Sequence, residues 1–124
     1  MKLNTKILAL LLMGLFSMLS FISYADEAPE SIQLTLAVTA ADKINLTAVK
    51  TVEKGLNAYH AIKQLVVVGV KDTSYGPQIM SLGGIEATGN RYWALYVNGA
   101  MSMVGAHDVI LLDDTFIRLN MEDF

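Results

Sequence analysis

The sequence predicts an α+β fold in which one helix packs against a mixed sheet of about five strands. Three observations support this fold class. Apolar residues occupy every second position early in the chain, one segment has helical spacing, and the second half consists of strand-like segments separated by turns. The resulting order, strand–strand–helix–strand–strand–strand, is the one expected of a β-grasp domain, a ubiquitin-like roll.

The first two strand-like segments predict a β-hairpin. From Ile32 to Val38, apolar residues alternate with polar or small ones, which is the period of a half-buried strand. The segment from Ile44 to Val52 is rich in β-branched residues and predicts a second strand. Residues 40–43 are expected to form the turn between them.

A helix is predicted from Ala58 to about Val67. Asn57 precedes it as an N-cap, a position that asparagine favours. The apolar residues with helical spacing are Ala58, Ala61, Ile62 and Leu65. The valine run at 66–68 is compatible with a helix end or with the start of a strand.

The rest of the chain predicts strands and turns. Asn98-Gly99 is the sequence signal of a type I′ hairpin turn. In chain order, we expect a loop at 71–77, a strand at 78–82, turns at 83–84 and 87–90, strands at 91–97 and 100–104, a turn at 113–114 and a final strand at 115–120.

The first 25 residues have the pattern of a secretory signal peptide. Lys2 and Lys6 form a positive start, residues 7–22 are almost entirely apolar, and Ser23-Tyr24-Ala25 provides a cleavage pattern. We expect cleavage after Ala25, a short acidic tether at 26–30 and one domain at 31–124, in the periplasm or outside the cell. An uncleaved membrane anchor is the alternative.

Charge and cysteine content limit the partners. Two of the nine basic residues lie in the leader, which has no acidic residue, so residues 26–124 carry seven basic and 12 acidic residues, a net charge of −5. An acidic chain without a basic cluster is poorly suited to nucleic acid. The chain has no cysteine, so disulfides do not contribute to its stability.

The sequence contains no arrangement typical of an enzyme. His60 and His107, its two histidines, are far apart in sequence and belong to no metal-binding motif. Gly83-Gly84 is not followed by a helix, as a phosphate loop would be, and Asp113-Asp114 is most simply a solvated turn. We therefore expect a non-catalytic protein without a resident metal.

The segment 91–97 is unusually aromatic. It contains Tyr92, Trp93 and Tyr96, and the period of a strand places Trp93 on one face and both tyrosines on the other. One short helix covers only one face of a sheet, so the other face remains exposed unless something binds it. The exposed row is then either a half-buried surface or a binding surface.

Several short stretches resemble one family. They are Tyr75-Gly76-Pro77-Gln78-Ile79, Gly83-Gly84-Ile85, Tyr92-Trp93-Ala94-Leu95-Tyr96-Val97-Asn98-Gly99, Gly105-Ala106-His107-Asp108 and Asp113-Asp114-Thr115-Phe116-Ile117. Together they resemble the C-terminal β-grasp domain of the cobalamin carriers transcobalamin and intrinsic factor, and the related transcobalamin-like bacterial domains of unknown function (DUF4430). The resemblance covers about Glu53 to Met121.

The resemblance implies that cobalamin or a related corrinoid is the ligand. It also implies a set of ligand-binding residues: Tyr75, Gly76, Pro77 and Gln78 in a loop, and Trp93, Ala94, Leu95, Tyr96, Asn98 and Met101 along a hairpin. Trp93 and Leu95 would supply an apolar platform, and Gln78 and Asn98 would meet amide groups. The carriers have a glutamine where this chain has Ala94.

Two further expectations concern the partner. The carriers hold cobalamin between a helical domain and this β-domain, so a second protein or a second copy is expected to close the site here. The alternative function is a protein–protein or cell-surface interaction module that uses the same aromatic face.

Overall fold

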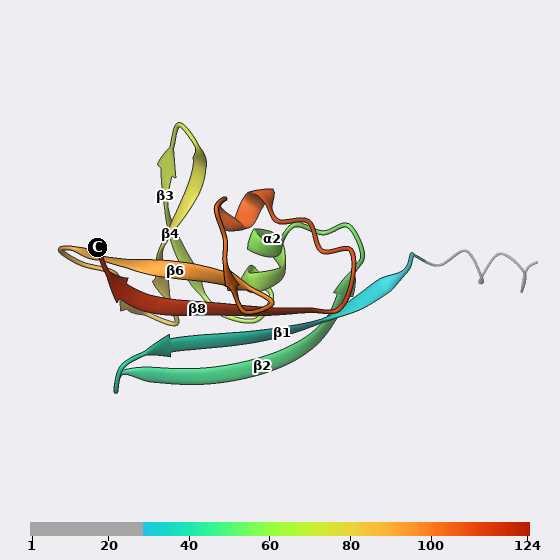
Figure 1. Ribbon diagram of the computed structural model, residues 1–124, viewed down its shortest axis with the longest axis horizontal. Helices are drawn as coiled ribbons and strands as arrows, with labels where there is room; N and C mark the ends of the chain where they lie inside the picture. The colour runs from blue at the N-terminus through green and yellow to red at the C-terminus, as the bar shows by residue number, and fades with distance from the viewer. Residues whose placement is uncertain (1–28) are drawn as a thin grey trace, which may run out of the picture.

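The computed structural model describes residues 29–124, and their main element is a five-stranded sheet (Figure 1). In spatial order its strands are β2 (Ile44–Glu53), β1 (Ser31–Ala40), β8 (Thr115–Asp123), β6 (Arg91–Val97) and β7 (Ala100–Met101). The central strands β1 and β8 are parallel and the other pairs antiparallel, so the sheet is mixed. The predicted leader and most of the tether lie outside the described residues.

A second sheet of three strands was not expected. It has the order β3 (Val68–Thr73), β4 (Gly76–Leu82) and β5 (Ile85–Glu86), and the β3–β4 hairpin stands out from the body of the molecule (Figure 1). The prediction of a loop at 71–77 was therefore wrong, because only Ser74 and Tyr75 connect the two strands. Side chains from Val70 to Thr73 are all exposed, so no alternation marked the strand.

The α-helix of the described region, α2 (Ala58–Lys63), packs against the five-stranded sheet. The predicted N-cap is confirmed, since Asn57 Oδ1 accepts a hydrogen bond of 2.9 Å from the His60 N–H. The helix ends four residues earlier than predicted, and Val68 instead pairs with Leu82 in the second sheet. No helix within residues 29–124 is long and apolar enough to cross a membrane.

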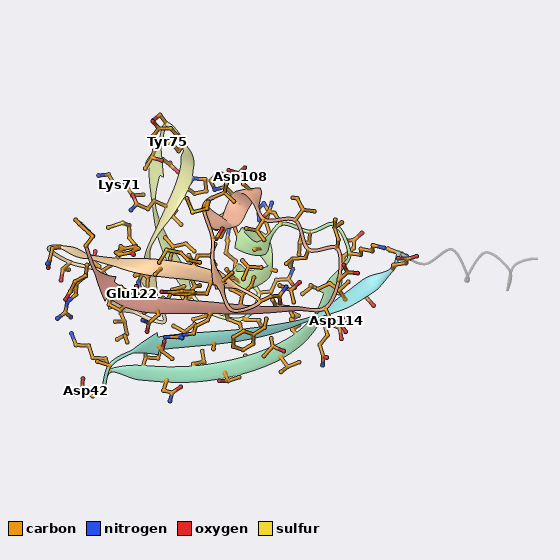
Figure 2. The ribbon with its side chains drawn as sticks, in the orientation of Figure 1. Asp42, Lys71, Tyr75, Asp108, Asp114 and Glu122 are labelled. Atoms are coloured by element: carbon orange, nitrogen blue, oxygen red, sulfur yellow. The ribbon has the colours of Figure 1, made fainter. Side chains whose placement is uncertain are left out.

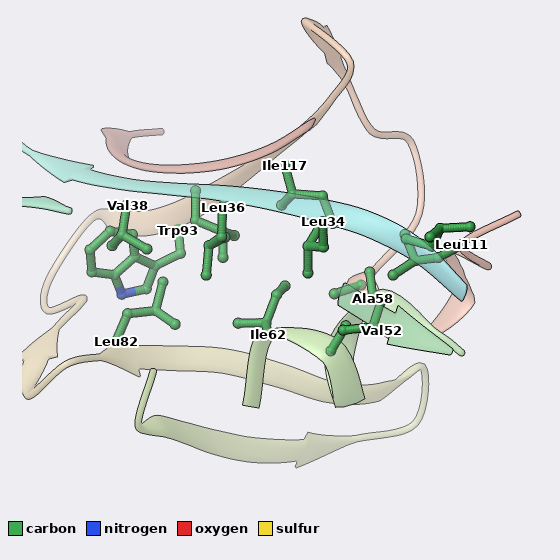
Figure 3. Close-up of a cluster of buried hydrophobic side chains, with 14 of the residues drawn as sticks. Leu34, Leu36, Val38, Val52, Ala58, Ile62, Leu82, Trp93, Leu111 and Ile117 are labelled. Carbon is green, nitrogen blue, oxygen red and sulfur yellow. The ribbon is translucent and has the colours of Figure 1, made fainter. Parts of the chain in front are cut away.

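The core lies between the five-stranded sheet on one side and α2 with β4 on the other. We call the face of the sheet that packs against α2 and β4 the covered face. The predicted alternation of β1 is confirmed, because its apolar row is buried on this face. Figure 3 shows the row beside Ile62 of α2, Leu82 of β4 and Trp93 of β6. The predicted α+β fold, with one helix on a mixed sheet, is thus confirmed for the described chain.

The opposite face of the sheet, which we call the open face, is covered by no other element among residues 29–124. The strand register places Thr35 beside Phe116 and Tyr96 beside Arg118 on this face. These side chains are exposed or half-buried, and 40% of Phe116 is accessible to solvent. The expectation that one helix leaves one face uncovered is confirmed.

The hairpin between β6 and β7 has the predicted turn but a shorter return strand. Asn98 and Gly99 have φ angles of 51° and 86°, the paired positive values of a type I′ turn. Strand β7 ends at Met101 rather than Val104, because the Ser102 hydroxyl donates to the Val104 carbonyl and turns the chain away. Strand β8 is longer than predicted, since β6 pairs with it as far as Asp123.

Candidate functional site

The β3–β4 hairpin and the loop that follows β7 enclose a hollow of about 480 Å³. Tyr75 is at the tip of the hairpin, and the 3₁₀ helix η2 (Ala106–Asp108) lies across from it (Figure 2). The lining residues are Thr73, Ser74, Tyr75, Gly76, Pro77, Gln78, Gly105 and His107.

A second hollow, of about 210 Å³, adjoins the first. The two share Pro77, Gln78 and Gly105, so we treat them as one groove. The other residues that line the second hollow are Ile79, Tyr92, Trp93, Leu95, Ser102, Val104, Ala106 and Leu119. The groove therefore runs from the exposed hairpin tip towards the core face of β6.

The hairpin approaches η2 closely at Gly76. Its φ angle is +106°, a conformation that residues with a side chain rarely adopt, and a Cβ there would collide with the imidazole of His107. His107 Nε2 lies 3.3 Å from Asp108 Oδ2. A glycine at position 76 thus leaves room for the His107 ring next to the hairpin backbone, where it lines the groove.

The residues around the groove make it nearly uncharged. Neither hollow is lined by any lysine, arginine, aspartate or glutamate of the described chain, and His107 is the one lining residue with a basic side chain. The lining combines apolar side chains, hydroxyls and one side-chain amide, that of Gln78. Such a surface suits a neutral ligand that is partly apolar and carries hydrogen-bonding groups.

Six of the ten predicted ligand-binding residues line this groove. They are Tyr75, Gly76, Pro77, Gln78, Trp93 and Leu95. Tyr75 is 88% exposed, as a contact residue at a rim can be. The structure corrects their setting, because Gly76 to Gln78 belong to β4 and not to a loop.

Trp93 was predicted to form part of an apolar platform for the ligand, but it is mainly a core residue. It is only 6% exposed and packs in the core near Val38 and Leu82 (Figure 3). Only a small part of its surface therefore reaches the groove, whose floor is formed jointly with Leu95 and Leu119. The main role of this large apolar ring is to stabilise the fold, because its burial removes much apolar area from water.

The other four predicted residues lie outside the groove. Ala94 and Tyr96 belong to the open face, and the Tyr96 hydroxyl donates a 2.6 Å hydrogen bond to Glu122 Oε2. Asn98 Oδ1 accepts a hydrogen bond of 2.9 Å from the Phe116 N–H, so this amide oxygen already links the turn to β8. Met101 lines neither hollow and is half exposed, next to the turn.

The Tyr96–Glu122 bond changes the acidity of both groups. It raises the pKa of Tyr96, because loss of the phenolic proton would break the bond and put two negative charges together. It lowers the pKa of Glu122, which also accepts a 3.1 Å bond from the Asn120 side-chain amide. This pair belongs to the open face and takes no part in the groove.

Residues of the loop after β7 were absent from the predicted set. Ser102, Val104, Gly105, Ala106 and His107 line the groove through the approach of this loop to β4. The Gly-Ala-His-Asp stretch did mark the region, since it is one of the stretches on which the family resemblance depends. Its sequence distance from the hairpin concealed the contact.

The comparisons with known proteins agree with the predicted resemblance. A family model for the domain of unknown function DUF4430 matches residues 50–122. The fold is similar to that of haptocorrin in complex with Cbi, a corrinoid, with a TM-score of 0.69 and 16% identity over 79% of this chain and 26% of that one. The chain thus spans about a quarter of haptocorrin's length.

A second structure covers a similar share of the chain. It is a protein from Ruminococcus gnavus, described as a candidate metal-binding protein, with a TM-score of 0.62 and 18% identity over 75% of this chain and 98% of that one. Within residues 29–124 here, no group of three His, Cys, Asp or Glu residues is placed to hold a metal ion. No curated protein matches the chain. Both similar structures are described by what they bind.

Proposed function

The chain belongs to the DUF4430 family, and on that premise we propose that it is an exported, non-catalytic protein that binds a small ligand in the groove, with cobalamin or a related corrinoid as the ligand class. The observation that supports this best is the convergence of two segments on one nearly uncharged groove. The β3–β4 hairpin and the loop at 102–107 line it together. Each contains part of a stretch that resembles the cobalamin carriers, residues 75–79 in the hairpin and residues 105–108 at the end of the loop.

The chemistry of the lining is compatible with a corrinoid. A corrin is a broad, partly apolar disc with amide groups at its rim, so it needs apolar contact and hydrogen-bonding partners at its edge. Tyr75, Pro77 and Val104 offer apolar surface, and Gln78 and Ser102 offer polar groups. Fold similarity to haptocorrin, which was solved with a corrinoid, supports the same ligand class.

The groove is open on one side, which supports the participation of a second protein or a second copy. Two lining residues are exposed and apolar, Tyr75 and Val104, and Met103 next to Val104 is 93% exposed. Exposed apolar side chains beside a ligand groove are typical of a contact region. We propose that a partner covers the ligand from this side and increases the affinity that one copy provides alone.

The direct test is titration of the purified chain with cyanocobalamin and with cobinamide. Binding is followed by calorimetry and by the change in corrin absorbance. The proposal predicts saturable binding of at least one of them. A ligand concentration of about 0.5 mM would fill a third of sites with a dissociation constant of about 1 mM. Absence of binding at that concentration, in chain shown to be folded, would reject the corrinoid proposal.

The groove itself is tested with a matched pair of aromatic variants. Tyr75→Ala removes an exposed ring that lines the groove, and we expect affinity to fall about tenfold without loss of stability. Phe116→Ala removes an accessible ring from the open face, outside both hollows, and should leave the affinity unchanged. Equal effects of the two variants would show that the groove is not the site.

Export has a separate test. If the leader is cleaved as proposed, the chain recovered from the periplasm or medium begins at Asp26, which intact-mass measurement resolves to a single residue. A chain that keeps residues 1–25 in the membrane fraction would favour the uncleaved anchor.

The open face supports the second candidate function, an interaction module. It presents Tyr96, Phe116 and Phe124 without a covering layer in the described chain. In this case Phe116→Ala should abolish capture of the partner, whereas Tyr75→Ala should not. Trp93→Ala is unsuitable for this comparison, because Trp93 is part of the core and its loss would destabilise the whole domain.

A further inference from the structure

Strand β2 forms one edge of the five-stranded sheet, on the side farthest from the β3–β4 hairpin (Figure 1). It pairs with β1 residue for residue over its ten-residue length and contains neither glycine nor proline. Every second residue of such a strand directs its backbone N–H and C=O away from the sheet. The outer side of β2 is therefore a long, regular template for another strand.

The charges at the ends of β2 are complementary to those of a second, antiparallel copy. A two-fold axis perpendicular to the sheet places one residue opposite itself, and Ala48 lies near the middle of the strand. With the axis at Ala48, extension of this register past the ends of β2 places Lys43 of the β1–β2 turn opposite Glu53 of the other copy, and Asp42 of the same turn opposite Lys54. All four residues are exposed, and Figure 2 shows Asp42 at the outer end of the β1–β2 turn.

Neighbouring registers are less complementary, since the axis at Leu46 keeps one kind of opposite-charge pair, Lys50 with Asp42, and the axes at Val49 and Lys50 keep none. With the axis at Val49, Glu53 lies opposite Asn45 and Lys54 opposite Ile44. With the axis at Lys50, the two lysines lie directly opposite each other, which is unfavourable. The Ala48 register also places Thr47 opposite Val49 on the open face, a pairing of β-branched residues that sheets favour.

We propose that two copies of the chain associate through their β2 edges, antiparallel about Ala48, so that the two sheets become one. Backbone hydrogen bonds hold the copies together, and the Lys43–Glu53 pairs select the register. Lys54 already bonds to Glu30 Oε2 of its own chain at 2.9 Å, so Asp42 joins an existing ion pair. Lys50, which would face its own copy with the axis at Lys50, lies opposite Leu46 here.

This interface lies at the opposite edge of the sheet from β7, whereas the groove is formed by β4, β6 and the loop after β7. Both grooves of the dimer therefore remain accessible. The association is independent of the ligand, so either proposal can fail without the other.

Charge reversal tests the register. Lys43→Glu and Glu53→Lys each place like charges opposite one another twice in a homodimer, and each should weaken association about tenfold or more. In an equimolar mixture of the two variants, every reversed charge of a mixed dimer meets an opposite charge, so dimer should reappear. Sedimentation over a range of concentrations measures all three samples and the parent chain. A parent chain that stays monomeric at millimolar concentration, or a mixture no more dimeric than its components, would overturn the proposal.

A cross-link tests the same register without relying on charge. Opposite Cα atoms in antiparallel strands are about 4.5–5.5 Å apart, within the range of a disulfide. Because the chain has no cysteine, Ala48→Cys should form one disulfide between copies under mild oxidation. Thr51→Cys is the matched control, since Thr51 lies opposite Asn45 and its sulfurs would be far apart. Equal cross-linking of the two variants would show that Ala48 is not on the axis.

Discussion

The covered and open faces of the five-stranded sheet carry similar residues with different roles. On β6, Trp93 and Leu95 face α2 and the second sheet, whereas Tyr92, Ala94 and Tyr96 face away. Trp93 and Ala94 are almost equally inaccessible, at 6% and 2% exposed. Trp93 is buried by a second layer, but Ala94 is shielded by larger neighbours in its own layer. A low exposed fraction therefore does not by itself identify the core.

The two faces are also stabilised differently. Apolar contacts between layers dominate the covered face, where Leu34, Leu36 and Ile117 are completely buried. On the open face, side chains bond along the surface: Thr39 donates to Asn120 Oδ1 at 2.6 Å, and Asn120 and Tyr96 both donate to Glu122. Loss of one contact should therefore cost much more on the covered face.

The largest effect is expected from truncation of Trp93. Trp93→Ala would leave a cavity between β6, β1 and β4 and should lower the free energy of unfolding by about 3–5 kcal/mol. Tyr92→Ala on the adjacent open row should lower it by about 1 kcal/mol or less. Chemical denaturation measures both. Similar losses for the two variants would contradict the assignment of the rows.

An intermediate effect is expected from enlargement of two buried alanines. Ala61 of α2 is 0% exposed between the helix and the sheet, so Ala61→Leu should overpack the core and cost about 1–3 kcal/mol. Ala94→Leu should change the free energy of unfolding by less than about 0.5 kcal/mol, because no described element lies above it. If Ala94→Leu proved as costly as Ala61→Leu, an additional layer would have to cover the open face.

The smallest effect is expected from Tyr96→Phe, and it should depend on pH. The depressed pKa of Glu122 gives a contribution to stability that is present above the ordinary carboxyl pKa, about 4.3, and is lost as the pH falls through the folded-state value. Removing the Tyr96 donor should therefore destabilise the chain slightly at pH 7 and less at pH 3. Tyr92→Phe is the control, since the Glu122 bond comes from Tyr96. A difference that is the same at both pH values would show that the Glu122 charge is not involved.

Local patterns in the sequence predicted the first hairpin, the helix start and the type I′ turn. Each depends on residues close in sequence: alternation in β1, an Asn57 cap, and Asn98-Gly99. The end of the helix and the β3 strand were missed, because Val68 to Thr73 are held by pairing with β4 rather than by their own pattern.

The candidate site divides in the same way. Tyr75 to Gln78 were predicted from one contiguous stretch, and they do line the groove. The loop at 102–107 was not predicted as part of the site, because its approach to β4 joins segments about thirty residues apart in the sequence. Period-two alternation correctly placed Trp93 in a different row of β6 from Tyr96, although Tyr92 also reaches the second hollow. It could not say which row the second layer would cover.

The sequence alone therefore determined the α+β class, the parity of the strands and the residues that terminate them, because these depend on steric preferences and hydrophobic period within a few neighbours. The tertiary structure decided that Trp93 belongs to the core, that Gly76 meets His107, and that two short segments enclose a groove. Contacts between distant segments arise from how whole layers pack, and packing of that kind leaves no periodic trace in either segment.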